Sequence, residues 1–147
     1  MKKLLYLKDQ QLKEYIENIF NGYRQTVSDA KKILEKYSLG VAHNKVINLV
    51  SLYEGITITD LLVKLKVTKQ SLNRVLQDLK RMKIIKQVKD NTDSRRKLLY
   101  LDQGGKKFYN EIFQSQKKRI FNALKDSDSD SVIKFKQVLE KIINGKK

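Results

Sequence analysis

Hydrophobic positions recur with a period near 3.6 residues in several stretches of the chain, which predicts a mostly helical protein. The first and longest stretch runs from about Asp9 to Tyr37. Gly22 lies inside it and weakens the helix without ending the pattern. The segment 38–40 closes this helix, and Gly40 is its expected C-terminal cap. A helix this long exceeds what so small a domain can cover by itself.

The middle of the chain predicts short helices joined by a tight turn. A helix over about 41–53 is followed by one that begins at Thr57, with Asp60 placed as in a capping box. After the turn 66–68, Thr68 is a suitable N-cap for a helix that reaches Met82. Two short helices joined by such a turn are typical of a helix-turn-helix.

The helix over 68–82 has two faces of opposite character. Its apolar side, expected to be buried, carries Leu72, Val75, Leu76, Leu79 and Met82. Its outer side carries Gln70, Asn73, Arg74 and Gln77. Amides and a guanidinium can make bidentate hydrogen bonds to base edges in a DNA major groove. An ordinary solvated helix face is the competing interpretation, and it does not require this set of groups.

After Met82 the pattern changes from helical to β-prone. The runs 84–89 and 97–101 flank a segment rich in turn formers, which predicts a two-stranded hairpin with basic residues at its tip and base. Asp102 is the expected N-cap of the next helix, and the segment 126–130 separates that helix from the last one. The predicted fold is mainly α with a small β-hairpin.

The formal net charge of +16 points to a polyanionic partner. Heavy use of lysine throughout the chain accounts for part of this excess. The segment 69–97 nevertheless holds ten basic and three acidic residues, a net of +7, against +4 in the 68 residues before it and +5 in the 50 after it. Charge is therefore densest where the helix and hairpin are predicted.

Several classes of site are excluded by composition. The chain has no cysteine, so it has no disulfide, thiolate metal site or thiol switch. It has a single histidine, no Gly-rich phosphate loop and no paired acidic motif, so we expect no catalytic site, no metal and no cofactor. The start MKKLLYLKDQ is a poor signal peptide, and no apolar run approaches the roughly 20 residues that span a bilayer. We expect a cytoplasmic bacterial protein with no membrane contact.

Three motifs resemble the MarR family of bacterial transcription regulators. GITITDLL is similar to the family's stretch before the turn, VTKQSLNRVLQDL to its recognition helix, and DSRRKLLYLDQGGKKF to its wing with the Asp-x-Arg signature. The upstream SLGVAHNKVINLV resembles a subgroup with a similar histidine. Lys66 departs from the family's frequent glycine in the turn, and Asp102 from its usual threonine.

The resemblance implies a winged helix-turn-helix fold in a single domain over 1–147. Residues 41–101 would form the DNA-binding core, and 1–40 and 102–147 would supply N- and C-terminal dimerisation helices. A winged helix has its own core, here expected from Val46 to Leu101, so the terminal apolar stripes need a second surface rather than the monomer core. The dimerisation candidates are Leu12, Ile16, Ile19, Phe20, Phe113, Phe121, Phe135, Leu139 and Ile142.

The candidate DNA contacts lie on the helix and on the wing. They are Thr68, Lys69, Gln70, Ser71, Asn73, Arg74, Gln77, Lys86, Asp93, Arg95, Arg96 and Lys97. Arg74 is the candidate for guanine, and the amides are candidates for adenine. The resemblance implies that Arg95 enters the minor groove and that Asp93 orients it. A charged hairpin tip that merely aids solubility is the alternative. Lys80, Arg81, Lys83 and Lys86 are phosphate contacts or simply solvated.

The family often binds small anionic aromatics in a crevice between its two parts. The resemblance makes Tyr23, Arg24, His43 and Tyr53 candidates for such an effector site, with Lys45 beside them. For His43 a structural role in the helix over 41–53 is the stronger interpretation.

These features predict a homodimeric, sequence-specific regulator that binds double-stranded DNA, most simply a repressor on a pseudo-palindromic site that a small effector releases. A sequence-tolerant architectural, nucleoid-associated protein is the alternative that the high charge supports. RNA binding is disfavoured because the wing carries no aromatic stacking strip.

Overall fold

The computed structural model describes residues 4–145. In chain order its elements are η1 (Leu5–Leu7), α1 (Asp9–Asp29), α2 (Lys31–Lys36), α3 (Val41–Leu52), β1 (Ile56–Thr57), α4 (Ile58–Leu65), α5 (Lys69–Arg81), β2 (Ile85–Lys89), β3 (Lys97–Leu101), α6 (Gln103–Leu124) and α7 (Ser129–Asn144).

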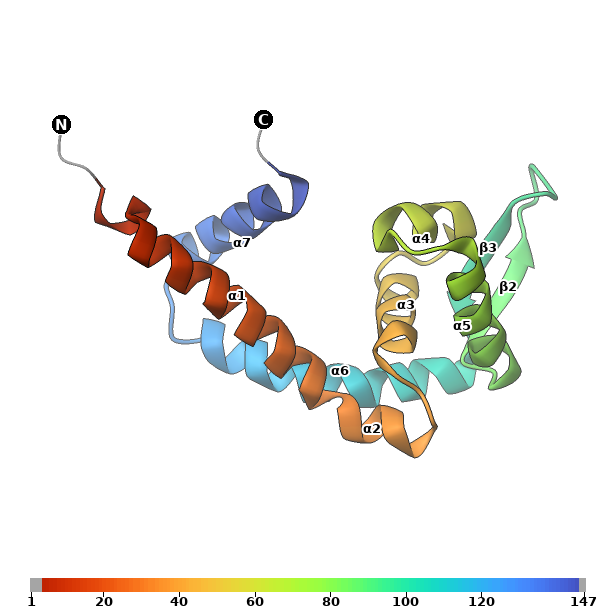
Figure 1. Ribbon diagram of the computed structural model, residues 1–147. Helices are drawn as coiled ribbons and strands as arrows, with labels where there is room; N and C mark the ends of the chain where they lie inside the picture. The colour runs from red at the N-terminus through yellow and green to blue at the C-terminus, as the bar shows by residue number, and fades with distance from the viewer. Residues whose placement is uncertain (1–3, 146–147) are drawn as a thin grey trace.

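The molecule consists of an arm and a lobe (Figure 1). Helices α1 and α6 pack along each other to form the arm, and α3, α4, α5 and the sheet form the lobe. The β2–β3 hairpin projects from the lobe, whereas η1 and α7 lie at the opposite end of the molecule. This is the predicted winged helix-turn-helix with terminal helices outside it.

The predicted helix starts are confirmed by their caps. The hydroxyl of Thr57 accepts from the backbone N–H of Asp60, and that of Thr68 accepts from Ser71, both at 3.1 Å. Asp102 caps α6. Lys66 has φ 53° and ψ 42°, so it does occupy a left-handed position, at a cost of roughly 1 kcal/mol for a residue with a Cβ.

The sheet has a third strand that the sequence pattern did not predict. Its order is β1-β3-β2, antiparallel throughout, with Ile56 opposite Leu99 and Thr57 opposite Leu98. A strand of two residues is too short to show alternation, and both of its residues are buried. Through β3 it anchors the hairpin to the start of α4.

The single long helix expected over Asp9–Tyr37 was wrong. Helix α1 ends at Asp29. Ala30, whose ψ is −9°, separates it from the second helix, α2. The apolar pattern runs unbroken through the break because Ala30 and Leu34 are both buried in the same core. Periodicity reports which positions are buried, and here it did not report the change of axis.

The C-cap expected at Gly40 was also wrong. Ser38 takes the left-handed position with φ 57°, and the N–H of Leu39 donates to the carbonyl of Leu34 at 3.0 Å. Gly40 is extended, with φ −127° and ψ −168°, and is the N-cap of α3. The left-handed residue lies two positions before the expected one, because the side chain of Leu39, between α2 and α3, is buried in the core.

The core of the lobe extends beyond the expected span. Val46, Ile47, Val50, Leu61 and Leu99 are fully or almost fully buried, as the pattern predicts. Phe108 and Ile112 of α6 join the same cluster, as do Ala30, Leu34 and Leu39 from the segment between α1 and α3. The first half of α6 and the segment α2 therefore pack on the lobe, whereas α1 has no buried residue.

Candidate nucleic-acid interface

Helix α5 presents its polar face outward as predicted. Leu72, Leu76 and Leu79 are buried beneath it. The outward residues are all exposed: Lys69, Gln70, Ser71, Asn73, Arg74 and Gln77. The hydroxyl of Thr68 donates to that of Ser71 at 2.8 Å, so these two side chains bind each other at the helix start. The amide and guanidinium groups further along remain directed at solvent.

Two side-chain contacts hold α5 against the rest of the lobe. Lys80 Nζ donates to Gln87 Oε1 of β2 at 3.1 Å. His43 of α3 lies 3.0 Å from Asp78 of α5, through Nε2 and Oδ2. The Nδ1 atom of His43 accepts from the N–H of Gly40 at 3.0 Å, which places the ring proton on Nε2 as the donor to Asp78. His43 therefore has the structural role that was favoured.

The bond from His43 is the main cause that lowers the pKa of Asp78, and the nearby Arg81 guanidinium adds to it. The carboxylate thus stays ionised between two donors on different sides. The role of Asp78 could not be predicted from the sequence, because an isolated acid on an amphipathic helix gives no sign of its distant partner.

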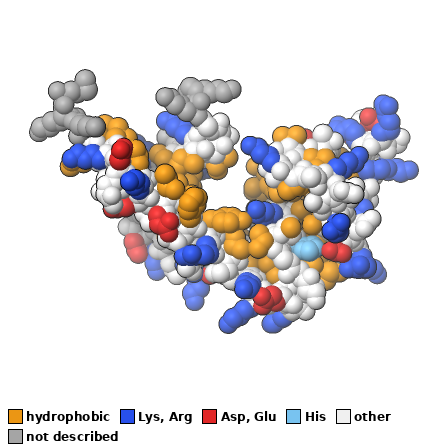
Figure 2. Space-filling model, viewed as in Figure 1, with side chains coloured by type: hydrophobic (Ala, Val, Ile, Leu, Met, Phe, Trp, Pro, Cys, Tyr) orange, Lys and Arg blue, Asp and Glu red, His pale blue; other side chains and the backbone are white. Residues whose placement is uncertain are grey.

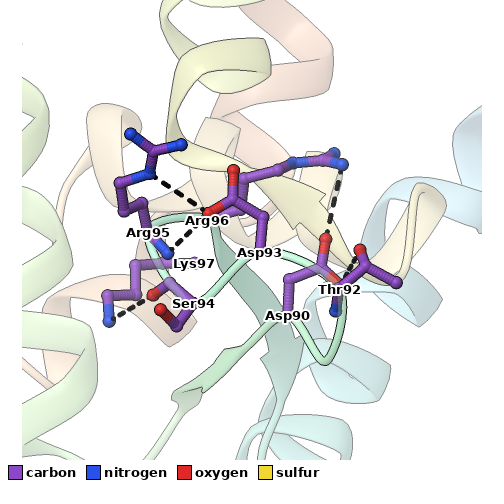
Figure 3. Close-up of polar contacts among 7 residues, drawn as sticks. All are labelled: Asp90, Thr92, Asp93, Ser94, Arg95, Arg96 and Lys97. Carbon is purple, nitrogen blue, oxygen red and sulfur yellow. Dashed lines mark hydrogen bonds and ion pairs between the residues drawn. The ribbon is translucent and has the colours of Figure 1, made fainter.

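The wing loop is held by two carboxylates (Figure 3). Asp93 Oδ1 accepts from the backbone N–H of Arg95 at 3.0 Å and lies 3.3 Å from its Nε. Asp90 accepts from the N–H and the hydroxyl of Thr92 and pairs with Arg96 at 3.3 Å. These contacts, the backbone bond from Thr92 first, lower the pKa of Asp90. Lys97 Nζ donates to the carbonyl of Ser94 at 3.4 Å.

The recognition helix and the wing meet at one groove of about 560 Å³. Lys69 and Asn73 of α5 line one wall, and Arg95, Arg96 and Lys97 line another. The remaining predicted contacts Gln70, Arg74 and Gln77 lie on the exposed face of α5, and Lys86 lies on β2. Five predicted residues from segments more than 20 positions apart are thus brought together.

The first turn of α4 completes the groove and was missed from sequence. Ile58, Thr59 and Asp60 line it beside Thr57. The capping pattern at Thr57 marked a helix start, where free backbone N–H groups favour anions. Here, however, Asp60 in the first turn of α4 adds a negative charge to the groove. That carboxylate disfavours a phosphate at this helix start.

Hydrophobic side chains cluster on the surface, whereas charged side chains are spread over both the arm and the lobe (Figure 2). Lysine and arginine are spread over the hairpin end, whereas hydrophobic side chains gather along the arm and in the hollow beside the lobe. The arm therefore exposes many large apolar side chains that nothing in the described chain covers.

Comparison with known proteins identifies the family. Residues 42–96 match the MarR family. The chain is 35% identical over 141 residues to the HTH-type transcriptional regulator PetP of Rhodobacter capsulatus, a match that covers 96% of this chain and 85% of that protein. The chain belongs to the MarR family. As a member it is a DNA-binding transcriptional regulator, and its relatives are regulators rather than enzymes.

Solved structures share the MarR fold at low identity. A MarR-family transcriptional regulator from Silicibacter pomeroyi superposes with a TM-score of 0.75 at 17% identity, covering 97% of this chain and 94% of its own. Streptococcus pneumoniae FabT, solved in complex with DNA, gives 0.69 at 16% identity, with 93% and 96% covered. Both likenesses extend over the arm as well as the lobe.

The effector candidates of this MarR-family chain come from different elements, and each has its own local contacts. His43 is bound at the start of α3, whereas Tyr53 lies beyond its end with the ammonium of Lys64 4.6 Å from the ring centroid. Tyr23 lies on α1, with Lys45 5.5 Å from its ring. Arg24 contacts Asn21 on its own helix.

The dimerisation candidates of the MarR-family arm are largely uncovered. Leu139 is half-buried, and the other eight are exposed.

Within residues 4–145 no helix is both long and apolar enough to cross a membrane. No cluster of three or more His, Asp or Glu suited to a metal ion occurs in that same range.

Proposed function

We propose that this MarR-family protein is a homodimeric, sequence-specific repressor that binds a pseudo-palindromic site in double-stranded DNA. One observation carries the proposal: Lys69 and Asn73 of α5 line the same groove as the wing arginines, and Arg74 and the other amides lie exposed on the same helix. Such an arrangement suits base contacts in the major groove and a shape-reading arginine in the adjacent minor groove. FabT, a structural neighbour, was solved in complex with DNA.

The second half of the proposal is the dimer. Large apolar side chains are exposed on η1, on α1, on the outer half of α6 and on α7; among them are Leu5, Ile16, Phe20, Phe121, Phe135 and Ile142. Exposed patches of this kind mark association surfaces. A two-fold partner would cover them and would place two α5 helices about one DNA turn (~10 bp) apart. Residues 41–101 would then read DNA, and the outer parts of 1–40 and 102–147 would dimerise.

An effector would act on the spacing of the two α5 helices. It can shift DNA affinity only if it binds the dimer shapes with different affinity. The α2–α3 junction is suited to transmit such a change, since His43 connects the backbone of Gly40 to Asp78 of α5.

The architectural alternative is supported by the net charge of +16. Such a protein would bind any duplex with a strong salt dependence and would have no preferred site.

Selection of bound duplexes from a random DNA pool tests the proposal. We expect a recovered palindrome with half-sites about one turn apart. Competition at moderate salt is the second measurement, in which random DNA should displace the selected duplex poorly. Equal displacement by random DNA would show that the alternative is correct.

A further inference from the structure

The two adjacent arginines of the wing are in different situations. The side chain of Arg95 is 91% exposed, and only its Nε has a side-chain partner among residues 4–145. The side chain of Arg96 is 56% exposed, and its Nη1 pairs with Asp90. Figure 3 shows Arg96 reaching back across the loop to Asp90, while the guanidinium of Arg95 extends outward.

Asp90 is built into the loop rather than simply near it. One carboxylate oxygen accepts two bonds from Thr92, at 3.1 and 3.0 Å, and the other faces Arg96. The backbone N–H of Asp90 also donates to the carbonyl of Arg96 at 3.1 Å. Residues 90 and 96 are thus joined by main chain and side chain at the base of the loop, and the Asp90 side chain is only 15% exposed.

The ion pair with Asp90 limits what Arg96 can contribute to DNA binding. A basic side chain adds to affinity and to salt dependence when it replaces a counterion on a phosphate. The carboxylate of Asp90 already balances the charge of Arg96. That carboxylate cannot rotate away from Arg96 without breaking its two hydrogen bonds with Thr92. Asp93 holds Arg95 by one edge only, which leaves both Nη groups available.

We propose that Asp90 is a positioning residue that withholds Arg96 from DNA, so that each wing presents one arginine, Arg95. This inference rests on the proposed function, since it concerns how the same wing meets a duplex. The chain then gains shape reading from Arg95 without the indiscriminate affinity of a second arginine beside it.

The test measures the salt dependence of binding by fluorescence anisotropy, with full-length protein and a duplex selected from a random pool. Asp90→Asn keeps an acceptor for Thr92 and removes the charge. We expect it to steepen the slope of log affinity against log salt by about 0.9 per wing, the value for one added phosphate contact. Affinity for random duplex should rise at low salt. Arg96→Ala should leave the slope unchanged. Arg95→Ala should reduce the affinity of the protein for the selected duplex.

The double variant Asp90→Asn with Arg96→Ala is the matched control, and its slope should return to that of the wild type. A slope unchanged in Asp90→Asn, or reduced in Arg96→Ala, would overturn the inference, because Arg96 would then be either inert or already on the DNA. Loss of affinity in Asp90→Asn at an unchanged slope would also overturn it, since Asp90 would then only shape the loop. Failure of the wild type to bind any duplex would refute the proposed function instead.

Discussion

His43 and Asp78 lie 35 positions apart in the chain, and their side chains meet at 3.0 Å between α3 and α5. The same imidazole accepts the N–H of Gly40, so one ring joins the α2–α3 junction to the helix that faces DNA. No other described side chain contacts both of these segments through hydrogen bonds from a single group.

His43→Ala should destabilise the fold and loosen α5. Removal of the acceptor for Gly40 costs about 1 kcal/mol in the free energy of unfolding, as for other helix caps. His43→Gln is the control, because its amide oxygen can accept the same bond at that helix position. Urea unfolding measures both variants, and the Gln variant should recover most of the loss. Equal stability of wild type and the Ala variant would contradict a capping role.

Acidification should weaken the connection between α1 and α6. Arg119 binds both carboxylate oxygens of Asp29, at 2.5 and 2.9 Å, and its hydrogen bonds are the main cause that lowers the pKa of Asp29 in the folded chain. A lowered folded-state pKa stabilises the fold fully above the unfolded-state value of about 3.9, and this contribution is lost as pH falls through the folded-state pKa.

The stability difference between wild type and Asp29→Asn should therefore shrink between about pH 5 and pH 2. Denaturant unfolding across that range measures it. In an Arg119→Gln background the same change should show little pH dependence, and a persistent dependence there would assign the effect to another group.

Gly105→Ala should strongly destabilise the protein, whereas Gly104→Ala should not. A Cβ built at Gly105 would lie 1.8 Å from the carbonyl oxygen of Ile84, in the backbone between α5 and β2. Relief requires α6 to move off the lobe, and such overpacking typically costs about 1–3 kcal/mol or more. At Gly104 the nearest atom is 3.5 Å away, an ordinary contact, and alanine favours the helix. Similar unfolding midpoints for the two variants would refute this close approach.

Arg74→Ala and Lys86→Ala should affect DNA binding in different ways. Loss of a bidentate base contact from Arg74 should cost about 1–3 kcal/mol and relax the preference at one base pair. Lys86 is exposed on β2 and should contribute only salt-dependent affinity, equal for all sequences. Binding to the selected duplex and its single-base variants separates the two. Uniform losses in both variants would mean that the outer face of α5 does not read bases.

Phe20→Glu should dissociate the proposed dimer. Phe20 is 64% exposed on α1, and a carboxylate there would have to be buried against a partner. Val63→Glu is the matched control, because Val63 is 69% exposed on α4, outside the arm. Sedimentation equilibrium should show a monomer for the first variant and a dimer for the second. Two dimeric variants would place the association surface elsewhere.

The sequence by itself determined which face of most helices is apolar and where most helices begin. Thr57, Thr68 and Asp102 cap their helices as predicted because a cap is a local interaction within a few residues. The two faces of α5 follow from a period of 3.6 residues, which depends on the backbone alone.

Only the tertiary structure decided the axis break at Ala30, the left-handed Ser38 and the pairing of β1 with β3. It also decided which partner each charged group has: Asp78 with His43, Asp29 with Arg119 and Asp90 with Arg96. The pairs Asp78–His43 and Asp29–Arg119 join segments far apart in the chain. These pairs, the helix end at Ala30 and the turn at Ser38 depend on how distant segments pack in the core. Local periodicity contains no information on that packing.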